Sequence, residues 1–289
     1  MRLGRECDGM EKTKNGNLRV ALVTGASGVI GKAIARGIAR DPGFEVILLC
    51  RNEAKGRHAC QEIKWATGNS RVRHEVADVS RWTSIREMAK RWEGPLHVLV
   101  NNAAVTPRRR EETPEGLELQ FATNVLGYVW MIQAFSAQLK RSAPARVVNV
   151  ASNWAGGLDL TDLEFRRRRY TNGEAYRQSK QANRMLTVAF AEYLKPYRIF
   201  VNTCHPGNVN SLLSNNLGFG GSQTPDEGAR TPVWLAVSPI GQQVTGKFFE
   251  HMREVGCPFG ADRKAVDKLY QACLRFSGGR VEEGVRPLE

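Results

Sequence analysis

Two side chains that can exchange protons, Tyr176 and Lys180, stand four residues apart in the run Ala175-Tyr-Arg-Gln-Ser-Lys180. If this run is helical, both side chains lie on one face, one turn apart. A nearby ammonium favours the phenolate and lowers the pKa of a tyrosine toward working pH. The pair is therefore predicted to donate and accept protons. Any helix can carry this spacing, so the prediction depends on the motifs that precede it.

A glycine-rich turn follows the apolar run Arg19–Thr24 and precedes a helix-like stretch from Val29. Glycine lets the chain turn tightly and lets a pyrophosphate approach the backbone, while the next helix presents its N-terminal N–H groups to the anion. The pattern predicts a dinucleotide site, and an ordinary glycine-rich turn is the alternative. The loop residues assigned to the cofactor are Gly25, Ser27, Gly28, Ile30 and Gly31.

The end of the second apolar run is expected to select the cofactor. An acidic residue there would accept from a ribose 2′-hydroxyl and repel a 2′-phosphate. This chain has Arg51 and Asn52 instead. A guanidinium pairs with a 2′-phosphate as a planar fork, so NADP(H) is predicted over NAD(H). Ser27 and the more distant Lys55 are further candidates, and a solvated loop arginine is the alternative for Arg51.

The elements that must position these residues alternate between strand and helix. Strands are predicted at residues 19–24, 45–50, 72–76, 96–100, 146–151, 198–203 and 246–249. Helices are predicted at residues 29–40, 80–92 with Ser80 as N-cap, 115–141, 174–193, 225–237 and 261–276. A further helical stretch follows the second strand and ends at residue 66. This alternation indicates a parallel sheet covered on both faces. The fold class is α/β: a single doubly wound Rossmann domain with a roughly seven-stranded parallel sheet. It is expected to span 18–278, between a flexible extension at 1–17 and a tail at 279–289.

Composition excludes several classes of protein. The 289 residues are 42% hydrophobic, yet no apolar run reaches the roughly 18–20 residues of a membrane helix. Residues 1–17 are polar and carry no signal-peptide pattern. The net charge is +13, but aromatic residues do not interleave with the basic ones as in a base-stacking surface. For that reason we expect no nucleic-acid function. The six cysteines form no Cys-x-x-Cys pair, so we expect no metal site and a cytoplasmic protein with reduced thiols.

Several short motifs stand in a fixed order and together resemble a known family. They are Thr24–Gly31, Asp78-Val79, Asn101–Ala104, Asn124, Ser152, Tyr176 with Lys180, and Pro206-Gly207. From about residue 19 to 276 the chain resembles a short-chain dehydrogenase/reductase of the classical type. It is most similar to the retinol-dehydrogenase-like and WW-domain-oxidoreductase-like group, on residues 116–127 and 175–183. One departure is the middle glycine of the turn, which stands one place early at Gly28, with Val29 in its usual position.

The resemblance implies hydride transfer between NADP(H) and a small molecule, interconverting a lipophilic aldehyde or ketone and an alcohol. Tyr176 would be the general acid and base, and Lys180 would lower its pKa and hold the nicotinamide ribose. Ser152 would donate to the substrate oxygen, and Asn124 would hold a water that links Lys180 to solvent. The further cofactor contacts that the resemblance implies are Asp78, Val79, Asn101, Ala103, Pro206, Gly207 and Val209.

Three alternatives stay open at the level of sequence. A redox sensor would bind NADP without turnover, although the intact residues Tyr176, Lys180, Ser152 and Asn124 argue against it. A basic surface-binding protein would use the positive charge. The runs Arg108–Arg110 and Arg166–Arg169 are either an attractor for an anionic substrate or, as we favour, two solvated loop faces.

Oligomeric state is a separate question. A homodimer through the helices at 115–141 and 174–193 is what the family suggests. The stripe Ala182, Met185, Leu186 and Ala189 is better explained as core packing than as an interface.

Overall fold

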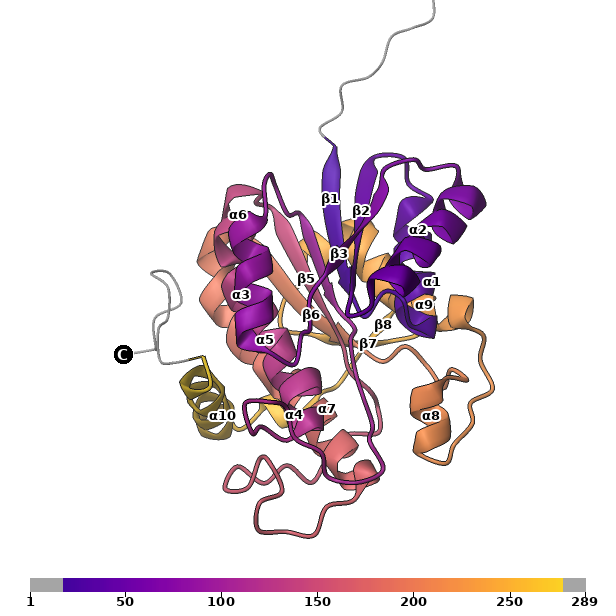
Figure 1. Cartoon of the computed structure of the whole chain (residues 1–289). Coiled ribbons are helices and arrows are strands. Elements are labelled where there is room, and N and C mark those ends of the chain that lie inside the picture. The colour runs from indigo at the N-terminus through magenta and orange to yellow at the C-terminus, as the bar shows by residue number, and fades with distance from the viewer. Residues whose placement is uncertain (1–17, 278–289) are drawn as a thin grey trace, which may run out of the picture.

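The computed structural model describes residues 18–277, which form one mostly parallel sheet with helices on both faces (Figure 1). Its strand order is β3-β2-β1-β4-β5-β6-β7-β8. The strands are β1 (Arg19–Thr24), β2 (Phe44–Cys50), β3 (Val72–Val76), β4 (Val98–Asn101), β5 (Ala145–Val150), β6 (Ile199–Cys204), β7 (Phe248–Glu250) and β8 (Arg253–Val255). The order reverses between β1 and β4, which places a ligand crevice at the carboxyl ends of these strands. The predicted doubly wound fold is confirmed.

The strand count differs from the expected seven by one. β8 pairs antiparallel with β7, whereas β1 to β7 are parallel to their neighbours. All three residues of β8 are exposed. An exposed three-residue strand has no alternation of buried and polar residues, so the sequence gives no signal for it.

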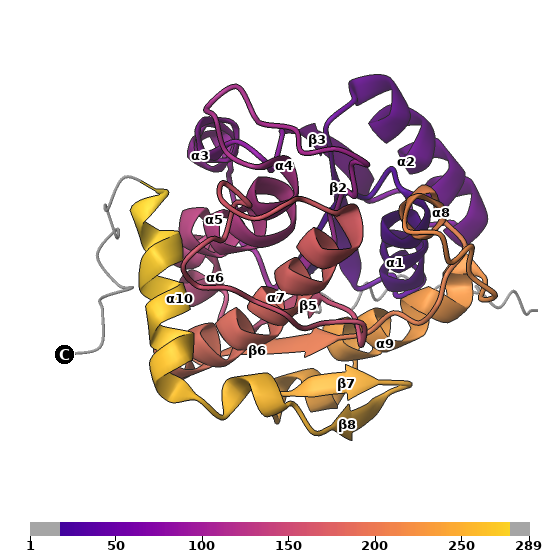
Figure 2. The ribbon, with the colours of Figure 1, turned by 90° about the horizontal axis from the view of Figure 1, so that it is seen from below.

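Two helical layers bury the two faces of the sheet. On one face lie α1 (Val29–Ala39), α2 (Glu53–Thr67) and α9 (Pro225–Val237). On the other lie α3 (Trp82–Arg91), α5 (Gly127–Ala134), α6 (Ser136–Arg141) and α7 (Asn172–Leu194), with α10 (Arg263–Arg275) packed outside α7 (Figure 2). Successive residues of β1 divide between the layers, as the period of two requires: Val20 and Leu22 join one core and Ala21 and Val23 the other.

The single helix predicted at residues 115–141 is wrong. The chain forms a short α4 (Leu119–Phe121), a wide π-turn at Ala122–Leu126, then α5 and α6, with a break at Phe135. At Gly127 a Cβ atom would lie 2.8 Å from the carbonyl oxygen of Val79. The segment therefore passes too close to the loop after β3 for any larger residue. A π-turn of this kind is frequent at functional sites, and here it contains Asn124.

Ser80 does not cap a helix as predicted. The hydroxyl and backbone N–H of Ser80 both donate to Asp78 Oδ1, at 2.7 and 3.0 Å. The hydroxyl is thus engaged in a local turn, and α3 begins two residues later, at Trp82.

The remaining elements are short. They are α8 (Leu212–Asn216) and 3₁₀ turns at Lys195–Tyr197, Pro239–Gln242 and Pro258–Gly260. In the described part of the chain no helix has the length and apolarity to cross a membrane. The predicted extension at 1–17 and the tail at 279–289 lie outside the described residues. Ala182, Met185, Leu186 and Ala189 are buried within the domain, as the core interpretation of that stripe requires.

Candidate active site

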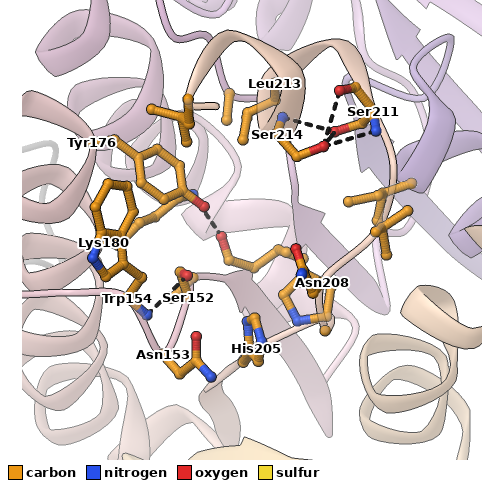
Figure 3. Close-up of a pocket in the computed structure, with 18 of the residues that line it drawn as sticks. Ser152, Asn153, Trp154, Tyr176, Lys180, His205, Asn208, Ser211, Leu213 and Ser214 are labelled. Atoms are coloured by element: carbon orange, nitrogen blue, oxygen red, sulfur yellow. Dashed lines mark hydrogen bonds between the residues drawn. The ribbon is translucent and has the colours of Figure 1, made fainter. Parts of the chain in front are cut away.

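A pocket of about 340 Å³ opens at the carboxyl ends of β5 and β6, against the first turns of α7 (Figure 3). It brings together predicted residues that are far apart in sequence. Those that line it are Ile30, Ser152, Tyr176, Lys180, Pro206, Gly207 and Val209. In Figure 3 Ser152, Tyr176 and Lys180 gather on one side, and Ser211, Leu213 and Ser214, of α8 and its cap, lie on the other.

Helix α7 supplies the tyrosine and the lysine. Its N-cap is Thr171, whose hydroxyl oxygen accepts from the backbone N–H of Glu174 at 3.2 Å. A cap of this kind fixes the start of a helix. Tyr176 and Lys180 then fall on one face of the first turns and are both buried, 8% and 2% exposed. The predicted helical placement of this pair is confirmed.

The predicted lowering of the tyrosine pKa is wrong for this structure. Burial raises the pKa of Tyr176 to about 12, and a hydrogen bond with Ser152 opposes that rise. Removing a phenolate from water costs more than the neighbouring groups return. At neutral pH Tyr176 is therefore protonated and able to donate.

Lys180 is held away from the phenol by the backbone. Its ammonium donates to the carbonyl oxygen of Val150 at 2.9 Å and lies 5.6 Å from the centre of the Tyr176 ring. Burial lowers the pKa of Lys180 to about 7, against an opposing effect of Cys204. Its charge is thus only partly retained at neutral pH.

Ser152 links the strand end to the tyrosine. It is buried just beyond β5, and its hydroxyl oxygen accepts from the backbone N–H of Trp154 at 3.1 Å. The hydroxyl and the Tyr176 phenol both line the pocket, so the serine is in a position to donate to a substrate oxygen beside the phenol.

Asn124 is buried in the π-turn and does not line the pocket. Its amide oxygen accepts from Val105 N–H at 2.8 Å, and its amide nitrogen donates to Val105 C=O at 3.1 Å. A weaker contact of 3.3 Å reaches Ser179 Oγ, next to Lys180 in sequence. The side chain thus ties the loop after β4 to the start of the long helical segment.

The glycine turn forms a cradle that only glycine can form. Gly25 has φ +64°, and a Cβ there would lie 2.8 Å from Ala103 Cα. A Cβ on Gly31 would lie 2.4 Å from Gly25 O and 2.6 Å from Asn102 Nδ2. The backbone of the turn therefore lies so close to the end of β4 that no side chain fits between them, which is the close strand–turn–helix packing expected of a dinucleotide-binding turn. Gly28 is the looser position, with 3.2 Å to Gly25 O.

Thr24 and Asn102 hold this cradle. The hydroxyl oxygen of Thr24 accepts from the backbone N–H of Asn102 and of Ala103, at 2.8 and 3.0 Å. Asn102 Nδ2 donates to the carbonyl oxygen of Thr24 at 2.9 Å. Neither residue was assigned to the site from sequence, although Asn102 lies within the Asn-Asn-Ala-Ala motif.

The residues predicted to select the cofactor have different contacts in the structure. Asn52 caps α2, since its side-chain oxygen accepts from Lys55 N–H at 2.9 Å. Ser27 hydrogen-bonds the buried thiol of Cys50. Arg51 is exposed, and no hydrogen bond or ion pair engages its side chain among residues 18–277. Arg51 is thus available to an anionic ligand at the edge of the glycine cradle.

The other predicted cofactor residues surround the crevice without lining the pocket. Asp78 is half-buried and bonded to Ser80, and Val79 is buried. Asn101 is fully buried and donates to Asn149 Oδ1 at 3.0 Å. Ala103 is half-buried where it contacts Gly25. Asp78 and Val79 follow β3, Asn101 is the last residue of β4, and Ala103 follows it. All four therefore lie at the edge where a parallel sheet binds its ligand.

Comparison with known proteins agrees with this arrangement. The model of the family described as short chain dehydrogenase matches residues 19–218. This chain belongs to that family. It is 32% identical over 287 residues to retinol dehydrogenase 13 of Mus musculus, covering 92% of this chain and 86% of the relative. That likeness confirms the similarity to the retinol-dehydrogenase-like group.

Two solved structures resemble this short chain dehydrogenase in three dimensions. An uncharacterized protein from Mycobacterium Paratuberculosis is 26% identical with a TM-score of 0.76, over 90% of this chain and 93% of that one. The Pseudomonas aeruginosa RhlG/NADP active-site complex is 26% identical with a TM-score of 0.65, over 80% and 93%. The chain is thus an oxidoreductase of a family that uses nicotinamide cofactors.

Several residues that line the pocket of this short chain dehydrogenase were not predicted from the sequence. They include Trp154, His205, Leu213, Leu217 and Phe219. Trp154 lies against Tyr176, with ring centroids 5.9 Å apart and planes at 35°. The aromatic and leucine residues at 154 and 212–219 were visible in the sequence, but no spacing rule connects them with Ser152 or Tyr176.

The arginine runs of this short chain dehydrogenase do not line that pocket. Arg110 pairs with Glu112 at 2.6 Å, and Arg168 pairs with Asp162 at 3.3 Å. The buried Asp162 also accepts from the backbone N–H groups of Arg166, Arg167 and Arg168. The runs therefore fold a loop over the outside of α7, and the idea that they attract an anionic substrate to this pocket gains no support.

Proposed function

We propose that this short chain dehydrogenase is an NADP(H)-dependent carbonyl reductase or alcohol dehydrogenase acting on an uncharged, lipophilic aldehyde, ketone or alcohol. The observation that carries the proposal is the grouping of Ser152, Tyr176 and Lys180 in one pocket. A hydroxyl, a protonated phenol and an amine in this arrangement suit the proton side of hydride transfer.

In the direction of reduction, the substrate oxygen accepts hydrogen bonds from Ser152 and Tyr176. Both donors stand where negative charge develops on that oxygen, so they stabilise the transition state more than the ground state. Tyr176 then gives up its proton. The hydride to the carbonyl carbon would come from NADPH when it is bound. Lys180 favours the phenolate that remains, and its partial charge at neutral pH permits it to return a proton.

Asn124 has a different part in this proposal from the one its family suggests on sequence alone. It fixes the backbone of Val105 through two hydrogen bonds. The water relay from Lys180 through this region is supported only by the 3.3 Å contact of Asn124 with Ser179. We therefore propose Asn124 as a residue that positions the relay.

The preference for NADP(H) rests on Arg51. It is exposed and unpaired among the described residues, and no carboxylate stands at the end of β2 to repel a 2′-phosphate. The ribose and nicotinamide contacts proposed are Lys180, Pro206, Gly207, Val209 and Ile30, which line the pocket. The adenosine and phosphate contacts proposed are Gly25, Ser27, Gly28, Gly31, Arg51, Asn52, Asp78, Val79, Asn101 and Ala103.

The test is NADPH oxidation with a panel of straight-chain, cyclic and aromatic aldehydes and ketones. Tyr176→Phe is expected to lose about 10²–10⁴-fold in kcat, the usual contribution of a positioned acid, while it still binds NADPH. Tyr197→Phe, at a residue 39% exposed on the surface, is the matched control and should keep full activity. Equal rates for wild type and Tyr176→Phe would contradict the assignment. Cofactor binding without turnover of any carbonyl would favour the redox-sensor alternative.

A further inference from the structure

The pocket contains an aromatic pair, Trp154 and Phe219, that the proposed chemistry does not use. The two rings meet edge to face, with centroids 4.6 Å apart and planes at 84°. Trp154 follows the catalytic Ser152 by two residues, whereas Phe219 lies in the segment after α8. The pair thus connects the reacting end of the pocket to its outer wall.

Trp154 is held in a fixed orientation beside the reacting groups. Its plane is tilted by only 35° from that of Tyr176, and the Arg177 guanidinium lies 5.8 Å from its ring centre. Gly173 makes room for it, since a Cβ there would lie 3.2 Å from Trp154 Cη2. The indole is half-buried and still lines the pocket. These neighbours therefore fix the orientation of the indole at the pocket wall before a substrate arrives.

Charge in the pocket argues for a neutral substrate. Its lining residues, all described, include no carboxylate and no arginine. Lys180 is bonded to Val150. Burial, His251 and Arg184 lower the pKa of the other basic lining group, His205, to about 4. His205 is thus neutral at working pH, and Lys180, the remaining basic residue of the lining, is only partly charged and is already bonded to the backbone.

The outer wall contains, beside Ser211 and Ser214, large apolar side chains that are partly exposed. Leu212 and Phe219 are 77% and 50% exposed, and Leu213 and Leu217 face the pocket. Gly218, Gly220 and Gly221 all have positive φ, so the chain around Phe219 turns sharply. Large apolar side chains left in water here are available to a ligand.

We propose that Trp154 and Phe219 make this enzyme selective for neutral carbonyl compounds that carry a planar aromatic ring next to the reacting carbon. The ring lies against the indole while the carbonyl oxygen reaches Ser152 and Tyr176. This inference rests on the proposed reductase activity and names its substrate class. A saturated ring with the same number of carbons buries similar apolar area, so only the contact between the π systems distinguishes the two.

The experiment compares 2-naphthaldehyde with decahydronaphthalene-2-carbaldehyde. The readout is the ratio of their kcat/KM values in a variant divided by the ratio in the wild type, which cancels their intrinsic difference in reactivity. Trp154→Ala and Trp154→Leu are expected to lower the ratio about three- to tenfold, the range of ring–ring contacts. The loss should appear in KM more than in kcat, Trp154→Phe should keep most of the ratio, and Phe219→Leu should lower it partly.

Controls separate this inference from the function on which it rests. Trp65→Ala, at an indole 90% exposed on α2, should leave the ratio unchanged, and NADPH binding verifies that each variant is folded. An unchanged ratio in Trp154→Leu and Phe219→Leu would overturn the inference and leave the reductase in place. Reduction of alkyl aldehydes but not of aromatic ones would also overturn the inference and leave the reductase in place. Failure of the wild type to reduce any carbonyl while it binds NADPH would instead refute the proposed function.

Discussion

Burial changes the chemistry of the Tyr176–Lys180 pair in a way that spacing alone does not reveal. Both side chains are almost free of solvent, so the charged form of each loses hydration: the pKa of Tyr176 rises, the pKa of Lys180 falls, and the two values move apart. The phenol is the stronger proton holder, and the amine is near neutrality. This order suits proton donation by Tyr176 followed by resupply through Lys180.

Arg51→Ala tests cofactor choice at the scale of one residue. A hydrogen-bonded charge pair contributes about 1.5–3 kcal/mol, so the dissociation constant for NADPH should rise by roughly ten- to a hundredfold. The dissociation constant for NADH, which lacks the 2′-phosphate, should change little. Both constants are measured by titration of the purified protein.

Arg57→Ala is the matched control for Arg51→Ala. Arg57 is also an exposed arginine, but it pairs with Glu53 within α2 at 2.7 Å. Its loss should affect neither cofactor. Equal weakening of NADPH and NADH by Arg51→Ala would show that Arg51 supports the fold of the loop rather than the 2′-phosphate.

The start of the long helical segment depends on a buried acid, Glu118. Its carboxylate caps α4 by accepting from the N–H groups of Gln120 and Phe121, at 2.8 and 2.6 Å. Burial raises the pKa of Glu118 to about 7, although these two hydrogen bonds and the Arg110 charge oppose the rise and Glu164 adds to it. The cap therefore contains a group that ionises at working pH.

Glu118→Gln is expected to flatten the pH dependence of stability. In the wild type the folded state holds this proton up to about pH 7, whereas the unfolded state releases it near pH 4.5. The free energy of unfolding should then fall as pH rises through this window, by at most about 1.4 kcal/mol per unit, and level off above it. Glutamine keeps an acceptor oxygen for the cap but cannot ionise. Urea unfolding at pH 5, 6, 7 and 8 measures the difference.

Glu87→Gln on the exposed face of α3 provides the comparison for Glu118→Gln. It should leave the slope of the wild type unchanged. A slope in Glu118→Gln equal to that of the wild type would contradict the assignment of the buried proton to Glu118.

At the scale of elements, sequence reasoning located the strands because buried parallel strands are short apolar runs bounded by turns. Helix boundaries were less predictable. Nothing in the composition of residues 115–141 marks the π-turn, and the close approach of Gly127 to Val79 is a contact between distant segments that no local pattern contains. Ser80 is not the cap because α3 begins two residues later, at Trp82, while the Ser80 hydroxyl donates to Asp78 in a local turn. Local sequence patterns therefore predict which helices and strands form, whereas tertiary contacts determine the residues at which they begin and end.

At the scale of the whole molecule, the order of the strands brings the predicted residues together. Ser152, Tyr176 and Pro206 follow or pack on β5 and β6, so the doubly wound order alone predicts a common site. The contact between Trp154 and Phe219 was not predictable from the strand order. Phe219 reaches Trp154 through a glycine-rich segment with no period, and its position depends on the packing of α8 rather than on the sheet.

The helical layer behind the site also contains a buried hydroxyl whose effect on the stability of the whole molecule can be measured. Tyr270 of α10 is fully buried, stacked on Tyr193 at 4.6 Å and edge-on to Phe190 at 5.3 Å. Its hydroxyl has no hydrogen-bond partner among the described residues. Such a group costs about 1–3 kcal/mol, whereas the ring contributes packing between α10 and α7.

The two parts of Tyr270 should therefore have opposite effects on stability. Tyr270→Phe removes the unpaired hydroxyl and is expected to raise the free energy of unfolding by about 1 kcal/mol. Tyr270→Ala removes the ring and should lower it by about 3–5 kcal/mol. Urea unfolding measures both, with the surface variant Tyr197→Phe expected within about 0.5 kcal/mol of the wild type. A loss of stability in Tyr270→Phe would show that the hydroxyl is bonded after all, by water held between the two helices.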